Sequence, residues 1–255
     1  MDRYEDLINK LLKVSEELYK VASDLEKELD KEKKYVINGY NFTQDQYDAC
    51  NYCIANYSSI TKDTDDFLKF VSVNDFNGSQ IKEIGHQWDV VKDNKSIFTK
   101  DFSSMRIYYV SQAIRGEHPL RLYLRSDVKV EKLPVLYHAN FCGVDIEPYI
   151  NLYNSEQLYK IIDCLLVSNE ISPILNPDYS SEQMQAVFDC SRLKGFNTSI
   201  LDPSFSEQKI NLLKYAYRNG LDYMMFANSK MSVSEMTDLI ESQLSNKNAT
   251  IRKQV

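Results

Sequence analysis

One pattern occurs twice in residues 179–226. The first copy, residues 179–204, is YSSEQMQAVFDCSRLKGFNTSILDPS, and the second, residues 205–226, is FSEQKINLLKYAYRNGLDYMMF. An aromatic residue followed by Ser opens both copies, and an apolar residue stands five positions later in each. Self-similarity with a period between about 20 and 50 residues is typical of stacked repeat proteins. The stretch therefore predicts a fold built from 26-residue repeats.

The same spacing can be followed from residue 76 towards the C-terminus in four columns of residues. The opening column is Phe76, Phe102, Val128, Tyr153, Tyr179, Phe205 and Met231, with steps of 26, 26, 25, 26, 26 and 26 residues. The second column is Ile81, Ile107, Leu133, Leu158, Met184, Ile210 and Met236. The third is Ile84, Val110, Leu136, Ile161, Val187, Leu213 and Leu239. The fourth is small in most copies, with Gln87 as the exception: Ala113, Ala139, Cys164, Cys190, Ala216 and Ser242.

Each repeat is expected to contain one long and one very short helix. Apolar residues at i, i+3 and i+7 form one helical stripe, as in Ile210, Leu213 and Tyr217. Residues that favour helix N-caps precede the stripe at Asn77, Ser103, Asn154, Ser180, Ser206 and Ser232. Residues that favour a left-handed C-cap follow it at Gly116, Gly143, Asn169, Gly195 and Gly220. The pattern predicts an all-α fold, specifically an α-solenoid of short helix-turn-short-helix repeats with a long N-terminal helix.

Three short motifs in the last repeats resemble a known family. They are Tyr179-Ser-Ser-Glu-Gln-Met184, Gly220-Leu-Asp222 and Phe226-Ala-Asn228. Helical repeats with similar motifs occur in uncharacterised proteins of clostridial and other Gram-positive bacteria, many of which look like cargo of plasmids, phages or conjugative elements. The resemblance covers residues 76–245 and is good only in the last repeats. It implies helical-repeat scaffolding and a mobile genetic element setting, and it supplies no catalytic residues.

The N-terminal 38 residues form a segment of their own. Tyr4 starts a heptad seam that continues through Leu7, Leu11, Val14, Leu18, Val21 and Leu25 and predicts one helix to about Lys34. The seam has two interpretations. It is either a coiled-coil dimerisation arm that makes a homodimer, or a helix that folds back onto the first repeat as a polar cap.

The remaining segments follow from where the columns begin and end. Residues 39–75 are interpreted as a divergent first repeat, with an insertion expected as a loop at residues 58–66. Residues 76–245 form the repeat array, and residues 246–255 a polar C-terminal tail.

Composition favours a soluble cytoplasmic protein without a metal or cofactor. The formal net charge is −7, no 18-residue apolar run exists to cross a membrane, and the charged N-terminus is unlike a signal peptide. Five Cys residues are scattered, and the pair Cys50 and Cys53 has no second pair or nearby His that would indicate a zinc site. We therefore expect no cofactor, no metal and no membrane.

A basic cluster in repeats two and three is the most unusual part of the surface. The candidate partner-binding residues are Arg106, Tyr109, Arg115, Arg121, Tyr123, Arg125, Lys129 and Lys132. One interpretation is a solvated face neutralised by nearby Glu and Asp. The other is a patch for an acidic protein surface or a phosphate backbone, because Arg binds carboxylate and phosphate in bidentate fashion.

No motif of an enzyme is present, so we expect a binding protein. Phosphate loops, metal-binding helices and nucleophile elbows are all absent from the sequence. The expected function is a non-catalytic protein-binding repeat module, and the resemblance to mobile-element proteins implies that a phage or other mobile element encodes it. It would inhibit or modulate a host protein such as a defence nuclease, for example as an anti-CRISPR inhibitor of a CRISPR effector. The alternative is a nucleic-acid-binding repeat protein that uses the basic cluster.

Overall fold

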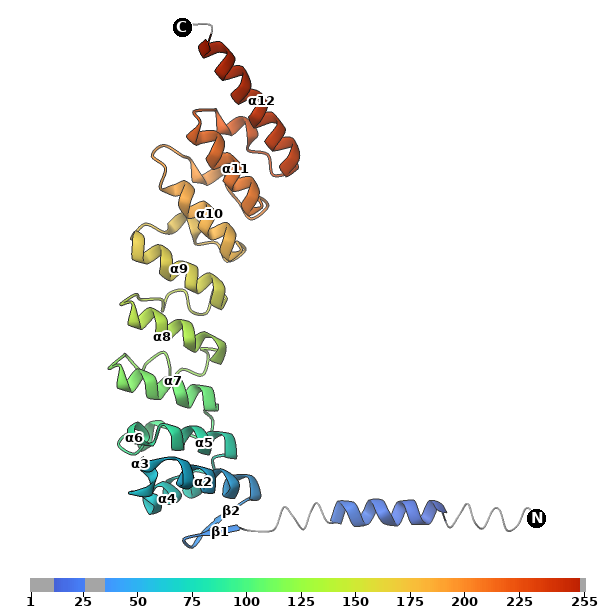
Figure 1. The fold of residues 1–255 in the computed structure, drawn as a ribbon, viewed down its shortest axis with the longest axis vertical. Helices are drawn as coiled ribbons and strands as arrows, with labels where there is room; N and C mark the ends of the chain where they lie inside the picture. Colours follow the sequence, from blue (N-terminus) through green and yellow to red (C-terminus); the bar gives the residue numbers. More distant parts are fainter. Residues whose placement is uncertain (1–11, 26–34, 253–255) are drawn as a thin grey trace, which may run out of the picture. The chain divides into compact units, whose positions relative to one another are not determined.

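The computed structural model describes residues 12–25 and 35–252. These residues are mainly helical and contain one two-stranded sheet (Figure 1), which agrees with the all-α class. The chain divides into two compact units, residues 1–118 and residues 119–255. We call them the first and second unit and describe each by itself.

The first unit contains a β-hairpin that the sequence analysis did not anticipate. β1 (Tyr35–Ile37) pairs antiparallel with β2 (Tyr40–Phe42). The turn residues Asn38 and Gly39 have φ values of 48° and 83°, as a tight hairpin turn requires. The segment boundary expected at residue 38 lies in this turn, so the hairpin joins both sides of it. The signal was in the sequence, since Asn-Gly between short apolar runs predicts a hairpin.

Helices follow the hairpin in the first unit. They are α2 (Gln44–Asn56), α3 (Ser58–Thr61), α4 (Thr64–Val73), α5 (Gly78–His86), α6 (Trp88–Val91), the 3₁₀ helix η1 (Lys95–Ile97) and α7 (Ser104–Arg115). The loop expected at residues 58–66 is therefore wrong, because α3 and the start of α4 occupy it. Asp65 and Asp66 lie in the first turn of α4, where negative charge favours a helix.

The second unit contains the clearest repeats. Its elements are η2 (Val130–Lys132), α8 (Leu133–Phe141), α9 (Ser155–Val167), η3 (Ser172–Ile174), α10 (Ser181–Ser191), η4 (Thr198–Ile200), α11 (Glu207–Arg218), η5 (Tyr223–Phe226) and α12 (Val233–Arg252). Each long helix from α8 to α12 packs against the next one in the chain. The short second helix of each repeat is a 3₁₀ turn at η3, η4 and η5, and residues 147–150 form only a turn. Residues 246–252 of the expected polar tail are helical, because α12 continues to Arg252.

The predicted helix caps are confirmed at most positions. The Asn77, Asn154 and Ser180 side chains accept hydrogen bonds from the backbone three residues on, and the Gln there bonds back to complete a capping box. Gly143, Gly195 and Gly220 have the positive φ of a left-handed cap. Gly116 does not, since the next residue, Glu117, takes the positive φ instead.

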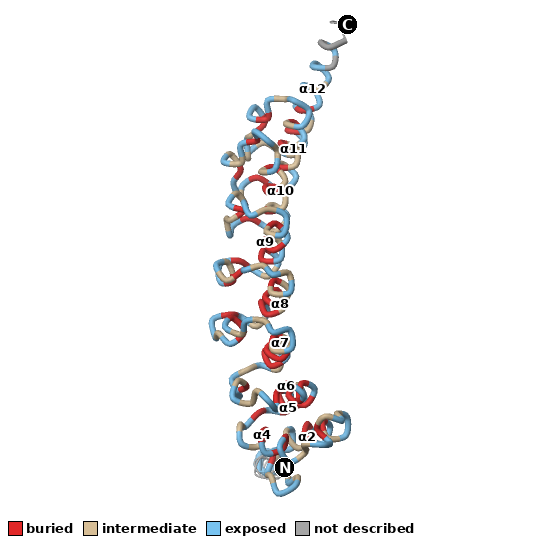
Figure 2. The backbone as a smooth tube through the Cα atoms, turned by 90° about the vertical axis from the view of Figure 1, so that its left-hand side faces the viewer, coloured by how far each residue is buried: buried red, intermediate tan, exposed pale blue. Residues whose placement is uncertain are grey.

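The apolar columns form the core of each unit. All seven residues of the second column are fully buried, and buried residues recur in every long helix of the second unit (Figure 2). In the third column only the last member, Leu239, is exposed, whereas the preceding Leu213 is buried. Trp88 is buried too, with its ring against Phe67 and Phe70 of α4. The 26-residue period is therefore a period of core packing.

Candidate protein-binding surfaces

Three of the eight candidate partner-binding residues are buried. Arg106 is 6% exposed, Lys132 is 8% exposed and Tyr123 is fully buried. Burial lowers the pKa of both Arg106 and Lys132 below the ordinary values. The Tyr123 hydroxyl accepts a hydrogen bond from Asn140 Nδ2 at 3.0 Å. These three side chains stabilise the fold, so their assignment to a binding surface is corrected.

Arg106 and Lys132 belong to a column that the sequence analysis did not recognise. It stands four residues after each opening residue, and we call it the clamp position: Gln80, Arg106, Lys132, Gln157, Gln183, Lys209 and Glu235. A long polar side chain stands there in every repeat. This column could have been recognised in the sequence, because it recurs with the same 26-residue period as the apolar core columns.

The clamp position ties each repeat to the loop of the next. Gln157 Nε2 donates to the carbonyl oxygens of Pro177 (2.8 Å) and Tyr179 (2.6 Å), which lie 20 and 22 residues on. Gln183 Nε2 donates in the same way to Pro203 (3.0 Å) and Phe205 (2.6 Å).

Three further clamp residues, one Gln and two Lys, make similar bonds. Gln80 reaches the carbonyl oxygens of Lys100 and Phe102. Lys132 Nζ donates to the Ile150 carbonyl, and Lys209 Nζ donates to that of Ser229 at 2.6 Å. A carbonyl cut off from water needs such a donor. In these repeats the clamp position is therefore occupied by a long donor, whereas Glu235 in the last repeat is an acceptor, bound by the Ser232 backbone N–H.

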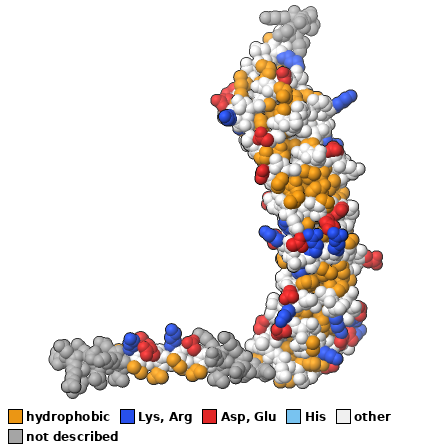
Figure 3. Space-filling model, turned by 180° about the vertical axis from the view of Figure 1, so that it is seen from behind, with side chains coloured by type: hydrophobic (Ala, Val, Ile, Leu, Met, Phe, Trp, Pro, Cys, Tyr) orange, Lys and Arg blue, Asp and Glu red, His pale blue; other side chains and the backbone are white. Residues whose placement is uncertain are grey.

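The more exposed basic candidates are paired with carboxylates. In the second unit Arg121 contacts Glu147, and Arg125 contacts both Glu147 and Asp127. Lys129 Nζ lies 4.0 Å from Glu131 Oε1. On the face drawn in Figure 3, Lys and Arg side chains lie beside Asp and Glu. The pairs neutralise much of the charge that suggested a patch for phosphate.

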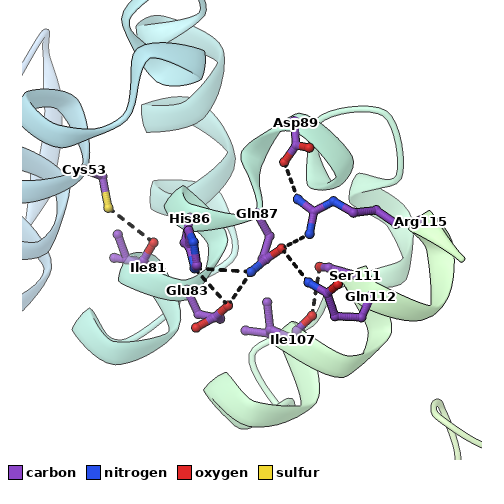
Figure 4. A network of polar contacts seen from close by, with 10 residues as sticks. All are labelled: Cys53, Ile81, Glu83, His86, Gln87, Asp89, Ile107, Ser111, Gln112 and Arg115. Carbon is purple, nitrogen blue, oxygen red and sulfur yellow. Dashed lines mark hydrogen bonds and ion pairs between the residues drawn. The ribbon is translucent and has the colours of Figure 1, made fainter. Parts of the chain in front are cut away.

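Arg115 of the first unit belongs to a polar network around Gln87 (Figure 4). Gln87 is 1% exposed, donates to Glu83 Oε1 at 2.9 Å and accepts hydrogen bonds from Gln112 and Arg115. Arg115 Nη2 also donates to Asp89 at 2.6 Å. The network explains why Gln87 stands where most other repeats have a small residue, since the Gln87 amide joins α5 to α7.

The remaining candidate, Tyr109, is half-buried, with its ring 5.0 Å from that of Tyr108. The eight residues thus do not form one exposed surface within either unit. Arg106, Tyr109 and Arg115 lie in the first unit and the other five in the second.

The dimerisation candidates lie partly outside the described residues, because Leu7 and Leu11 precede residue 12. Residues 12–25 are helical. Val14, Leu18, Val21 and Leu25 on this helix are all more than half exposed. None of these four side chains is buried against residues 12–25 or 35–252, which the structure describes.

A groove on the second unit was not singled out from the sequence. It has a volume of about 370 Å³ and is lined by Lys160 of α9, by Ser181, Glu182, Gln185, Ala186 and Asp189 of α10, and by Glu207 and Asn211 of α11. Its three carboxylates outnumber its single ammonium group. Asp189 is bound by Lys214 Nζ at 2.9 Å and by Gln185 Nε2 at 2.8 Å. Lys214 therefore neutralises Asp189, and the other two carboxylates of the groove are Glu182 and Glu207.

Exposed aromatic residues lie in the same repeat columns as the groove. Tyr159 stands 26 residues before Gln185, and Tyr215 stands 26 residues after Asp189. Their exposed fractions are 40% and 49%. The columns six and ten residues after each opening residue could have pointed to this surface. They show no recurring apolar pattern, which indicates that they face solvent.

The chemistry of the described residues does not single out a catalytic or metal site. Burial raises the pKa of the Cys50, Cys53, Cys164 and Cys190 thiols to about 12, so they stay protonated and poorly nucleophilic at neutral pH. Within residues 12–25 and 35–252, no three or more His, Cys, Asp or Glu side chains are grouped to hold a metal ion. In the same ranges no helix has the length and apolar character needed to cross a bilayer.

Compared with protein-family models, curated proteins and solved structures, the chain matches none. The resemblance to the mobile-element repeats therefore rests on its three motifs alone.

Proposed function

We propose that the chain is an α-solenoid module that binds a protein partner and has no catalytic activity. The partner offers a basic segment with neighbouring apolar side chains. The observation that carries this proposal is the groove across α9, α10 and α11, whose lining includes three carboxylates. The exposed Tyr159 and Tyr215 stand in the same repeat columns as Gln185 and Asp189 of the groove. Repeat arrays use extended faces of this kind for binding.

The charge state of the groove supports a cationic ligand. The hydrogen bond from Ser180 Oγ, at 2.8 Å from Glu182 Oε2, lowers the pKa of Glu182. That carboxylate is therefore ionised at neutral pH. Glu207 Oε1 accepts a hydrogen bond from Asn211 at 2.7 Å, which orients it on the next helix. A Lys or Arg side chain between them would gain two charged contacts.

The resemblance to mobile-element proteins suggests a biological setting for this proposal. The basic segment would belong to a host protein, such as a CRISPR effector or another defence nuclease whose nucleic-acid channel is lined with Lys and Arg. The module would inhibit it by covering that channel with carboxylates in a cytoplasmic encounter. No contact described above favours the nucleic-acid alternative over this one, because the more exposed basic candidates face carboxylates.

Affinity capture from a Gram-positive host lysate tests the proposal. Tagged protein is incubated with lysate, with and without nuclease, and the retained proteins are identified by mass spectrometry. We expect a protein partner that survives nuclease treatment. Recovery of partners only together with nucleic acid would overturn the proposal in favour of the nucleic-acid alternative.

A further inference from the structure

The third apolar column of the repeats ends on an exposed residue. Leu213 of this column is fully buried in α11, and the two elements that follow α11 in the chain, η5 and α12, both pack against it. Leu239 holds the same place in α12 but is 44% exposed. Among the described helices of the second unit α12 is the last (Figure 1), and none follows to cover Leu239. This face of α12 is therefore the one on which a further repeat would stack.

A pocket lies on this face of α12. It has a volume of about 540 Å³ and is lined by Asn228, Lys230, Met231, Glu235, Asp238 and Leu239. Met231 and Leu239 belong to the first and third apolar columns of the repeats. The residues that precede them by 26 positions, Phe205 and Leu213, are buried. The apolar part of the pocket therefore continues the core of the repeat array.

The clamp position at this end has the opposite hydrogen-bonding character to that of the preceding repeats. Gln183 and Lys209 donate forward to backbone carbonyl oxygens of the repeat that follows. Glu235 stands at the same position and is an acceptor. Its Oε2 accepts a hydrogen bond from the Ser232 backbone N–H at 2.7 Å, which lowers the pKa of Glu235 and keeps it ionised at neutral pH. A helix that stacks on α12 would therefore have to supply the donor.

The pocket has a net negative charge. Glu235 and Asp238 contribute two carboxylates, and Lys230 contributes the one ammonium group of the lining. Among the residues that the structure describes, no Lys or Arg forms an ion pair with either carboxylate. A Lys or Arg side chain beside them would gain charged contacts, and an apolar side chain over Leu239 would remove its surface from water. An amphipathic helix with a basic residue next to its apolar stripe offers both.

We propose that this pocket on α12, which we call the open end, binds an amphipathic helix of a partner protein. The helix stacks on α12 as a further repeat would, with apolar side chains on Met231 and Leu239 and a Lys or Arg on Glu235 and Asp238. The inference does not depend on the groove, because the open end and the groove share no lining residue.

The same charges disfavour a second copy of the chain as the occupant. In a two-fold pair the same face of each copy meets. Glu235 and Asp238 would then approach Glu235 and Asp238 of the partner subunit, so two faces of net negative charge would repel each other. A helix of basic character has no such cost.

A helical peptide of known composition tests the proposal. The probe is an amphipathic peptide of about 20 residues made of Leu, Ala and Lys, and the control peptide has Glu in place of every Lys. Both carry a fluorophore, and fluorescence anisotropy follows their binding to the full chain. We expect saturable binding of the Lys peptide and at least about tenfold weaker binding of the Glu peptide. Absence of saturable binding, or equal binding of the two peptides, would overturn the proposal.

Variants of the open end locate the site, after circular dichroism has shown that each is folded. Leu239→Asp should weaken binding of the Lys peptide at least about tenfold. Glu235→Gln with Asp238→Asn should also weaken it about tenfold, although Gln keeps the capping box of α12. Glu182→Gln with Glu207→Gln is the matched control, because it removes two charges from the groove and should leave binding unchanged. A loss confined to this control would place the peptide in the groove and overturn the proposal.

Native mass spectrometry of the full chain tests for a second copy at the open end. Leu239→Asp should leave the number of chains in the particle unchanged, because the occupant is another protein. An oligomer that Leu239→Asp dissociates would show that a second copy covers the open end and would overturn the proposal.

Discussion

At the scale of single residues, the clamp position shows how one column of side chains serves two purposes. In the capping-box repeats, the Gln side-chain oxygen accepts from the N-cap backbone while the amide nitrogen donates to the next repeat. The same column accounts for Arg106 and Lys132. Their charge made them look like surface residues, whereas the period of 26 marks them as internal ones. Their residue type alone led to the wrong prediction that they lie on the surface. Their register in the 26-residue repeat would have corrected that prediction.

Removing a clamp should therefore destabilise the fold. Gln183→Ala leaves the Pro203 and Phe205 carbonyl oxygens without their donor and should lower the free energy of unfolding by about 1–3 kcal/mol. Urea unfolding followed by circular dichroism measures it. Gln208→Ala on the neighbouring helix is the control, since Gln208 is exposed. Equal effects of the two substitutions would show that the clamp contributes no stability.

Replacing a lysine clamp by the residue found in other repeats should be tolerated. Lys209→Gln keeps a donor for the Ser229 carbonyl and adds a capping-box acceptor opposite Ser206, so we expect a gain of about 0.5–1 kcal/mol. Lys209→Met keeps the length of the side chain and removes the donor, and it should destabilise. Thermal unfolding of both variants should rank them in that order, and the reverse order would refute the clamp at this repeat.

The groove carboxylate Asp189 makes stability depend on pH. Burial alone would raise the pKa of Asp189, but the hydrogen bonds from Lys214 and Gln185 lower it more. The unfolded chain then takes up this proton at a higher pH than the folded chain. The stabilisation is complete above the unfolded pKa of about 4 and is lost as pH falls below it.

The Lys214→Met variant isolates this contribution. The difference in unfolding free energy between wild type and Lys214→Met should be largest near pH 6 and should shrink by pH 3. Urea unfolding at several pH values measures it. A difference that stays constant across this range would mean that the Lys214 contact does not lower the pKa of Asp189.

At the scale of helices and strands, the sequence predicted what repeats and missed what does not. Periodicity predicts the helix caps, such as Asn154 with Gln157, and the second column of core residues. Each of these features recurs in several repeats, so the copies support one another even where a single copy is ambiguous. The hairpin at residues 35–42 and the helices within residues 58–73 occur once, so only local signals could reveal them. The Asn38-Gly39 turn was such a signal. The exposed groove faces carry no apolar pattern, and for that reason periodicity did not point to them.

A matched pair of leucines tests whether each helix depends on the following one. Leu213 and Leu239 occupy the same column 26 residues apart, but Leu213 is fully buried and Leu239 is 44% exposed. Leu213→Ala should cost about 2–5 kcal/mol, and Leu239→Ala under about 1 kcal/mol. Chemical denaturation of both variants checks this. Similar costs would show that Leu239 is buried in solution, by a further segment or a second copy.

At the scale of the whole molecule, the proposed binding function depends on one surface of the second unit, the groove across α9, α10 and α11. The sequence predicted the helical class and the repeats, because these depend on core residues that recur. It did not predict the groove, because the solvent-facing columns that line it carry no recurring apolar pattern. The basic cluster illustrates the difference, since its most conspicuous residues turned out to be engaged within the fold.

The most direct test of the central claim is a titration of the captured partner against groove variants. Calorimetry would compare wild type with the double variant Glu182→Lys and Glu207→Lys, and with the control Arg121→Glu and Lys129→Glu, after circular dichroism has shown that all three are folded. Our account predicts that the groove variant loses at least about tenfold in affinity while the control stays close to wild type. Unchanged binding by the groove variant, or a loss confined to the control, would contradict it.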